Sequence, residues 1–432
     1  MKKRFIFILC GLFLCAGTIA ATDYNALQQG AVGDGRTLNT KSLQSAIDAL
    51  HEKGGGQLYF PAGRYLTGSL QLKSNVTLYL EKEAVLLGST SPYDYPGFST
   101  EKELKVNNDH FDQALIYVEG AENIDITGEG CIDGQGRELA LTIDSLHHTG
   151  ELVDKHYNTY RKRPNTRPKL LFMRNCRKVE LRKTNFRSGA AWGLSFSLCA
   201  DLTIDSLHVE NRAYWNNDGI DISDCKEVRI SNCFINSADD GICLKSHNRG
   251  AWNDRVSISN CHIISSASAI KFGTESLGGF KNVTIDNIRI KDTFRSAIAI
   301  ESVDGAEIEN VKLENIEIVC PGRATRGMAY MSVSRLKDVP ENEKGYPEFT
   351  MFEELPSWGF YVRHVKGIQM HNVKLRLQED DFRAAFVFDR VSNVRLSGIS
   401  LPENKKAGQV VLRQTSLQSS DNAVKEYITE VE

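Results

Sequence analysis

The chain has 432 residues, of which 41% are hydrophobic and 25% are charged, and its formal net charge is −3. This composition is ordinary for a soluble protein, and the length is ample for a large core. The slightly acidic balance argues against a nucleic-acid-binding protein, because such proteins present a basic surface to phosphates. After the first 21 residues, no stretch is long and apolar enough to suggest a membrane span.

The first 21 residues have the pattern of a secretory signal. A basic start, Met1 to Arg4, precedes an apolar run from Phe5 to Ala20, and Ala20 and Ala21 offer a small-residue cleavage site. We therefore expect export to the periplasm or the extracellular space. Removal of this leader lowers the formal charge from −3 to −6, because the leader carries three basic residues and no acid.

The first predicted element of the mature chain is a helix from Thr40 to Glu52. Its apolar residues recur at helical spacing: Leu43, Ala46, Ile47 and Leu50. Three glycines, residues 54 to 56, follow and are expected to end the helix. We expect this helix to cover the N-terminal end of the repetitive structure that follows. Residues 22–432 are assigned to one domain, because no segment has the composition of a linker.

A short pattern, apolar-x-apolar-x-x-apolar-x-apolar, recurs along most of the chain. Its clear units begin at Val179, Leu202, Val228, Val256, Val283, Val311, Ile368 and Val394, with weaker ones at Val76 and Ile124. The clear starts are 23 to 28 residues apart, except for one step of 57 that is either two coils or one coil with an insertion. Each unit predicts two short strands, and a third strand follows most of them. The fold class is therefore all-β, a parallel β-helix, whereas propeller blades need four strands and about 40 residues or more.

Two segments interrupt the repeat, from Arg137 to Pro168 and from Pro321 to Trp358. Long insertions on a repeat scaffold usually form loops on one face, often the binding face. The second insertion contains several aromatic residues, which suit either a local core or sugar-stacking platforms: Tyr330, Tyr346, Phe352 and Trp358.

Two acidic motifs, about one coil apart, carry most of the information about chemistry. They are Asn216-Asn217-Asp218-Gly219-Ile220-Asp221 and Asp239-Asp240-Gly241-Ile242. If the chain coils with this period, Asp218 and Asp240 lie on neighbouring strands about 4.8 Å apart, with Asp239 beside them. Three crowded carboxylates repel one another and do not help folding. Such a cluster usually holds a cation or transfers protons, because crowding raises the pKa of one carboxyl while another stays ionised.

Stacking the third strands in register predicts columns of neighbouring residues. The column just before the turn contains Trp192, Asp218, Asp240, Ser268 and Ser296. The first outward column on the strand contains Ser195, Asp221, Cys243, Lys271 and Ala299. The second outward column contains Ser197, Ser223, Lys245, Gly273 and Glu301. Lysines beside carboxylates suit an acidic sugar polymer, although both lysines could equally be plain solvated residues. The candidate catalytic residues are Asp218, Asp239 and Asp240. The candidate substrate-binding residues are Asn216, Lys245, Lys271 and Glu301, and no metal ligands are proposed.

Other polar residues of the repeat are expected to be structural. A set of asparagines is assigned to turns or side-chain ladders: Asn232, Asn260, Asn287, Asn310, Asn315 and Asn372. The eight cysteines after the leader contain no Cys-x-x-Cys pair, which argues against a zinc site. We favour buried free thiols stacked in the core over disulfides.

The chain resembles glycoside hydrolase family 28, the polygalacturonase and rhamnogalacturonase family. The resemblance rests on residues 30–35, 54–56 and 61–65, Arg167-Pro168, Trp192, Asn216-x-Asp218-Gly219 and Asp239-Asp240-Gly241. It implies a right-handed parallel β-helix and hydrolysis with inversion, without a metal or cofactor. It also implies that Asp240 is the general acid, with its pKa raised by its neighbours, and that Asp218 and Asp239 activate water.

The sequence departs from the polygalacturonase pattern at two places. The family's Gly-His-Gly is replaced by Ala267-Ser268-Ala269, and its Arg-Ile-Lys is replaced by Ala299-Ile300-Glu301. The family's cations grip the galacturonate carboxylate, so their loss, together with repulsion from Glu301, disfavours plain polygalacturonan. We therefore lean towards rhamnogalacturonan-type oligosaccharides, with Lys271 or Lys245 replacing the lost contact.

Several alternatives remain open from the sequence alone. They are a polygalacturonase acting on homogalacturonan, a polysaccharide lyase that uses calcium and a basic residue, and a non-catalytic glycan-binding β-helix. The insertions could wall off one end of a groove, which would favour exo action. The expected spacing of the carboxyls conflicts with the expected inversion. Inverting enzymes space their carboxyls about 6.5–9.5 Å apart, whereas residues one coil apart should be separated by a shorter distance. We expect a monomer whose only partner is the pectic substrate.

Overall fold

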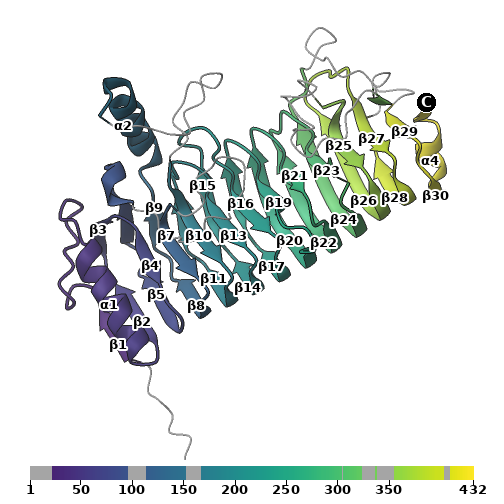
Figure 1. The fold of residues 1–432 in the computed structure, drawn as a ribbon. Coiled ribbons are helices and arrows are strands. Elements are labelled where there is room, and N and C mark those ends of the chain that lie inside the picture. The colour runs from purple at the N-terminus through teal and green to yellow at the C-terminus, as the bar shows by residue number, and fades with distance from the viewer. Residues whose placement is uncertain are drawn as a thin grey trace, which may run out of the picture.

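The computed structural model describes residues 22–95, 113–151, 167–303, 305–323, 336–337, 355–402 and 409–432. The strands stack coil upon coil through parallel pairings, and the coils progress along one axis from the N-terminal to the C-terminal end (Figure 1). The leader, residues 1–21, lies outside the described residues. Most of the segment between Pro321 and Trp358, including Tyr330, Tyr346 and Phe352, also lies outside them.

One sheet of the described chain takes a single strand from each coil and carries the acidic motifs at its strand starts. Its twelve strands are β4 Leu70–Leu72, β7 Ala114–Glu119, β10 Lys169–Arg174, β13 Leu194–Ser197, β16 Ile220–Ser223, β19 Ile242–Ser246, β21 Ile270–Ser276, β23 Ile298–Glu301, β25 Ser357–Arg363, β27 Ala384–Asp389, β29 Val410–Arg413 and β31 Ile428–Val431. We call it the twelve-stranded sheet.

The remaining strands of the described residues form the nineteen-stranded sheet, which closes the coil. Its early members are β1 Thr22–Asn25, β2 Gly56–Phe60, β3 Gly63–Thr67, β5 Val76–Leu80, β6 Ala84–Gly88, β8 Glu122–Thr127, β9 Cys131–Asp133, β11 Arg177–Arg182, β12 Asn185–Arg187 and β14 Ala200–Asp205. The later members are β15 His208–Asn211, β17 Lys226–Ser231, β18 Phe234–Ser237, β20 Asn253–Ser265, β22 Phe280–Lys291, β24 Ile308–Cys320, β26 Val365–Leu377, β28 Ser392–Ser400 and β30 Leu417–Ser420.

The apolar positions of the repeat stack in register and form one continuous core. Val228, Val256, Val283 and Val311 follow one another on successive coils. They are at most 1% exposed. Val311 pairs directly with Ile368, so the 57-residue step is one coil that carries an insertion. The alternation of the sequence thus becomes an inner apolar face and an outer polar face.

The predicted turn asparagines occupy the corners between strand segments. All six have a left-handed φ between 51° and 56°: Asn232, Asn260, Asn287, Asn310, Asn315 and Asn372. Asparagine tolerates this region better than most residues. Their side chains also bond to one another across coils, as from Asn287 Nδ2 to Asn260 Oδ1 at 2.8 Å. The turn and ladder interpretation is confirmed.

Helices occupy the N-terminal end and the first insertion. Helix α1 spans Thr40–Glu52 as predicted and packs its buried face on β2 and β4. Helix α2 spans Gly136–Thr149, where we expected a loop, because Leu139, Ala140 and Ile143 form a buried stripe in an otherwise polar sequence. Shorter helical turns span Pro92–Asp94 (η1) and Asn422–Lys425 (α4).

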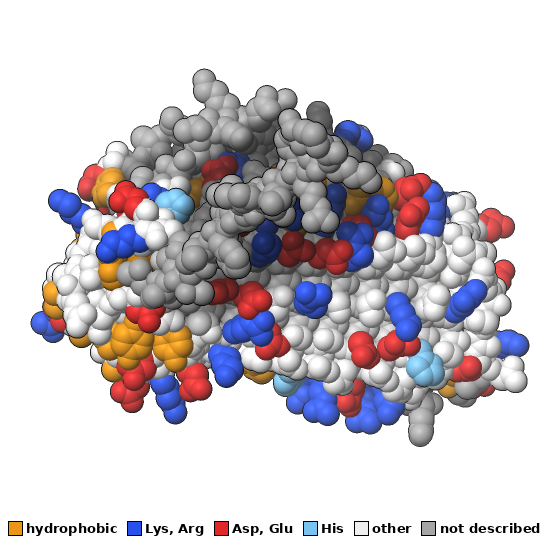
Figure 2. Space-filling model, turned by 90° about the horizontal axis from the view of Figure 1, so that it is seen from below, with side chains coloured by type: hydrophobic (Ala, Val, Ile, Leu, Met, Phe, Trp, Pro, Cys, Tyr) orange, Lys and Arg blue, Asp and Glu red, His pale blue; other side chains and the backbone are white. Residues whose placement is uncertain are grey.

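All eight cysteines of the described chain are free, as predicted, and seven are buried. No described helix is long and apolar enough to cross a membrane. On the face drawn in Figure 2, acidic and basic side chains are interspersed over much of the described surface.

Candidate active site

The acidic motifs meet at the start of two adjacent strands, β16 and β19. The Gly219 N–H donates to the Asp240 carbonyl at 2.9 Å, which sets the coil of Asp218 directly beside the coil of Asp240. The first outward column is as predicted, with Ser195, Asp221, Cys243, Lys271 and Ala299 paired in that order. The structure therefore brings the carboxylates and Lys271 onto neighbouring coils.

The second outward column is only partly as predicted. Ser197, Ser223 and Lys245 pair in register. The register then shifts, because Leu244 pairs with Phe272 but Ser246 pairs with Ser276. Two additional residues in β21 therefore displace Gly273 from Lys245, and the predicted continuation of this column was wrong.

A network of buried amides fixes the turn that leads to Asp218. Asn217 donates to the Gly189 and Ala191 carbonyls at 2.9 and 2.7 Å. Asn211 donates to the Asp218 carbonyl at 2.8 Å. These bonds hold the backbone of Asp218 in place, which suits a group that must meet a substrate in one geometry.

Arg167 holds the neighbouring part of the same turn. Its guanidinium donates to the Ala190 and Trp215 carbonyls at 2.6 and 2.5 Å and to Asn216 Oδ1 at 2.9 Å. The half-buried Asn216 side chain, predicted to bind substrate, is thus oriented by an arginine. Trp215 beside it is 63% exposed.

Asp218 belongs to a buried cluster with Asp221 and Lys245. The Lys245 ammonium nitrogen lies 3.1 Å from Asp221 Oδ1 and 3.6 Å from Asp218 Oδ2. All three side chains are at most 5% exposed. The Trp192 ring lies 4.5 Å from the same ammonium. Burial raises the pKa of Asp218 well above its ordinary value, and the Asp221 carboxylate adds to the increase.

Asp240 is equally buried but is surrounded by positive charge. Its Oδ2 lies 3.2 Å from the Lys271 ammonium. The Ser268 N–H donates to its Oδ1 at 3.2 Å. Burial raises the pKa of Asp240, but the cations of Lys271 and Arg295 outweigh it, and the resulting pKa lies below the ordinary value. The expected increase in this pKa was therefore wrong, because we counted neighbouring acids and omitted neighbouring cations.

Asp239 is half-buried, unlike the other two carboxylates. Its backbone is held by the Ser237 and Ser265 hydroxyls, which donate to its carbonyl at 2.8 and 2.6 Å. Its Oδ1 accepts the Asp240 N–H at 3.1 Å. The three predicted catalytic carboxylates therefore lie within one turn region of two adjacent coils.

Glu301 lies in a different environment from the one we expected. It is fully buried and pairs in register with Arg363, which pairs with Asp389, which pairs with Arg413. The last two form an ion pair of 2.8 Å. This alternation of charge supplies Glu301 with a neighbouring cation. Repulsion of a substrate uronate by Glu301 is therefore not expected.

Two charged residues near the acids were missed as candidates. The residues one position before the predicted column form a column of their own, in which Arg295 comes after Asp239 and Ala267. The charge of Arg295 acts on Asp240. Asp221 was placed in the correct column but was not selected. A search of each column for charge of either sign would have found both.

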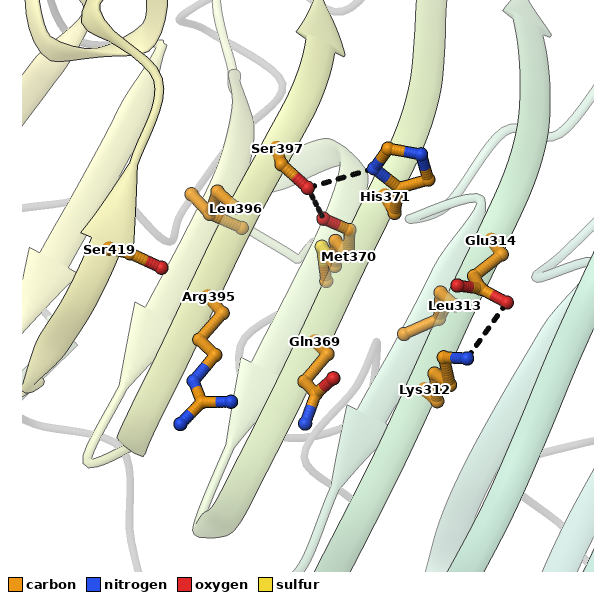
Figure 3. Close-up of a pocket in the computed structure, with 10 residues that line it drawn as sticks. All are labelled: Lys312, Leu313, Glu314, Gln369, Met370, His371, Arg395, Leu396, Ser397 and Ser419. Carbon is orange, nitrogen blue, oxygen red and sulfur yellow. Dashed lines mark hydrogen bonds and ion pairs between the residues drawn. The ribbon is translucent and has the colours of Figure 1, made fainter.

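A separate shallow pocket lies on the nineteen-stranded sheet (Figure 3). Its lining comes from β24, β26, β28 and β30: Lys312, Leu313, Glu314, Gln369, Met370, His371, Arg395, Leu396, Ser397 and Ser419. The His371 ring nitrogen Nδ1 and the Ser397 hydroxyl are hydrogen-bonded at 2.9 Å. This pocket shares no strand with the carboxylates, so we do not assign the chemistry to it.

Known proteins are similar to this chain in sequence and in structure. Residues 56–320 match the model of the glycosyl hydrolases family 28. A probable polygalacturonase of Vitis vinifera is 30% identical over 299 residues, which cover 65% of this chain and 55% of the relative. An exo-poly-alpha-D-galacturonosidase of Dickeya chrysanthemi is 28% identical over 248 residues, which cover 50% of this chain and 41% of the relative. The chain thus spans about half the length of the curated relatives it matches.

A solved structure extends the likeness to almost the whole chain. The family 28 exopolygalacturonase of Yersinia enterocolitica superimposes with a TM-score of 0.68 at 20% identity, covering 95% of this chain and 75% of that one. At this identity the likeness shows the fold, which is the right-handed parallel β-helix.

Proposed function

The chain belongs to family 28 of the glycosyl hydrolases, and on that basis we propose that it hydrolyses α-galacturonosidic bonds in pectic polysaccharide or its oligosaccharides. The observation that carries this proposal is the set of three carboxylates on adjacent coils, two of them in ion pairs with buried lysines. Proton transfer at a glycosidic bond needs a carboxyl that keeps its proton and one that stays ionised. The opposite pKa directions of Asp218 and Asp240 supply that difference.

We assign the acid–base work to Asp218, Asp239 and Asp240. Asp240, ionised beside Lys271, suits activation of water in the free protein. The proton donor is then one of the other two carboxyls. The family's inverting outcome is retained in this assignment, and proton NMR of the first-formed anomer tests it.

The substrate assignment rests on the charges around these acids. The absence of the family's Arg-Ile-Lys supports our preference for a rhamnogalacturonan-type oligosaccharide, in which a neutral rhamnose adjoins the galacturonate. A second candidate is homogalacturonan, which one specific observation favours. Lys271 and Arg295 both act on Asp240, and together they supply cations that a uronate carboxylate requires.

The outward face of the twelve-stranded sheet favours action near a chain end. Past Lys271 its first outward column is apolar and is covered by Leu336 and Leu355: Ala299, Tyr361, Val387 and Val411, all at most 1% exposed. On the other side of the acids, Tyr117 and Phe172 pack with Ala114 and Trp192. Among the described residues, the outward residues of β13, β16, β19 and β21 lie between these two clusters, a width of three strand steps or about 14 Å. A polymer lying across many coils would extend beyond this polar stretch.

The test is a product time course on rhamnogalacturonan and polygalacturonan oligomers of defined length. We expect turnover of a pectic oligomer with release from one end. Cleavage of polygalacturonan alone would reject the rhamnogalacturonan assignment, and early products of middle length would reject exo action. An unsaturated, ultraviolet-absorbing product whose formation stops with chelator would indicate a lyase. Binding without turnover on every oligomer would indicate a glycan-binding protein.

The cellular location follows from the leader. We propose that residues 1–21 direct export, so that the protein meets pectic fragments in the periplasm or outside the cell. Separation of cell fractions, followed by N-terminal sequencing of the protein, tests this proposal. A protein found in the cytoplasm with Met1 retained would contradict it.

A further inference from the structure

The cluster of Asp218, Asp221 and Lys245 contains two carboxylates and one cation in a space closed to water. Asp221 is fully buried, and the other two are 3% exposed. Ionised carboxylates are costly to bury unless each has a compensating charge or hydrogen-bond donors. One lysine cannot compensate two of them equally, so its position between them determines which carboxyl bears the unfavourable charge.

The distances show which carboxylate the lysine favours. The ammonium is 3.1 Å from Asp221 and 3.6 Å from Asp218. The Trp192 ring and the Cys243 sulfur, at 4.5 and 3.3 Å, also contact the ammonium and help to fix its place. Apart from this lysine, no described residue donates a hydrogen bond to Asp218 Oδ1 or to either oxygen of Asp221, so the lysine is what distinguishes the two carboxyls. Asp218 is thus the less compensated of the two carboxyls.

We propose that Asp221 is a positioning residue that draws the Lys245 ammonium away from Asp218, so that Asp218 keeps a proton in the free protein. The proposal deepens the proposed function, because it rests on Asp218 being one of the acid–base groups. Asp221 touches no substrate in this arrangement and acts through Lys245. Burial raises the pKa of both carboxyls, but the increase is larger for Asp218, because the Asp221 charge adds to it while the nearer Lys245 opposes the increase at Asp221.

Other charged and titratable groups face the cluster from every neighbouring coil. Lys169 on β10 and Asp239 and Asp240 before β19 act on its carboxyls, Cys243 on β19 and His247 after β19 are influenced by Lys245, and Lys271 on β21 acts on Cys243. None of them is altered in the variants below. Their effects are therefore common to all the proteins that are compared.

The experiment compares two nearly isosteric variants that should act in opposite directions. In Asp221→Asn the lysine is released to Asp218, and Asp218 should lose its proton at a pH lower by about one unit or more. In Lys245→Met the cation that is ion-paired with Asp218 is removed, and Asp218 should keep its proton to a pH higher by a similar amount. Infrared difference spectra follow the protonated carboxyl directly, and subtraction of the Asp218→Asn spectrum identifies its band.

Ser223→Ala is the matched control, because Ser223 pairs in register with Lys245 on the same outward face and carries no charge. It should leave the titration unchanged. Shifts in the same direction for both charged variants, or a wild-type protein without an Asp218-dependent band, would overturn the proposal. A general loss of packing would not move the two titrations apart.

Activity gives a second measurement. The limb of the kcat/KM pH profile that disappears in Asp218→Asn should move down in pH in Asp221→Asn and up in Lys245→Met. If no pectic substrate is turned over, the proposed function fails while the infrared titration still decides the role of Asp221. If turnover is normal and the two titrations do not separate, the inference fails alone.

Discussion

At the scale of single residues, Asp218 and Asp240 show how two carboxylates one coil apart acquire opposite properties. Both are 3% exposed, so burial alone would raise both pKa values. Asp240 also has Lys271 at 3.2 Å and a backbone N–H donor, whereas Asp218 must share Lys245 with Asp221. The position of each cation therefore decides which carboxyl stays ionised.

The first prediction concerns Asp240→Asn. We expect kcat to fall by about 10² to 10⁴-fold, the usual contribution of one acid–base group, while circular dichroism remains that of the folded protein. Asp286→Asn, on β22 of the other sheet, is the control and should retain kcat. An Asp240→Asn protein with nearly full activity would remove Asp240 from the assignment.

The same variant should change how stability depends on pH. The pKa of Asp240 is lowered in the folded state, so its ionised form stabilises the fold above the ordinary aspartate pKa. This contribution is lost as the pH falls through the lowered pKa. Urea unfolding should therefore show Asp240→Asn to be less stable than wild type near neutral pH, with the difference vanishing in acid.

At the scale of secondary-structure elements, the corners between strands depend on asparagine. Asn287 has a φ of 51° and donates to Asn260 at 2.8 Å, so it combines a left-handed backbone with a ladder bond. In this conformation the Cβ atom of alanine is crowded by the backbone, whereas glycine has no Cβ atom and is not strained.

We therefore expect Asn287→Ala to lower the free energy of unfolding by about 1–3 kcal/mol, from backbone strain and the lost hydrogen bond. Asn287→Gly is the matched variant and should be less destabilised, because it loses only the bond and some chain entropy. Urea unfolding of both proteins measures the difference. Equal stabilities for the alanine and glycine variants would contradict the strain argument.

At the scale of the whole molecule, the stacked coils bury seven of the eight cysteines of the described residues. Burial raises the pKa of Cys320 to about 11 and that of Cys199 well above the ordinary value. Thiolates are the reactive form, so these sulfurs should be inert at neutral pH.

We expect a thiol reagent at pH 8 to label the native protein slowly and the urea-unfolded protein at all eight cysteines that follow the leader. A reductant should leave the melting temperature unchanged, because no disulfide contributes to it. The half-buried Cys131 should react first in the folded state. An intact mass that increases by two hydrogens on reduction would show a disulfide and contradict this prediction.

The sequence by itself determined the repeat, the capping helix α1, the turn asparagines and the adjacency of Asp218 and Asp240. These features depend on the local alternation of apolar and polar residues and on a nearly constant coil length. Once the register of one coil is known, the coil length gives the position of each later residue in the same column. Insertions did not disturb this inference, since they leave the coil and return to it in register, as the pairing of Val311 with Ile368 shows.

Only the tertiary structure decided the features that depend on irregularities in the strand register and on charged residues from other coils. The register shift after Leu244 moved Gly273 out of its predicted column. The pairing with Arg363 gave Glu301 a cation from beyond the second insertion. Lys271, 31 positions beyond Asp240 in the numbering, reversed the expected direction of its pKa. A carboxyl's pKa depends on burial and on distances of a few ångströms, and neither quantity is written in the spacing of residues along the chain.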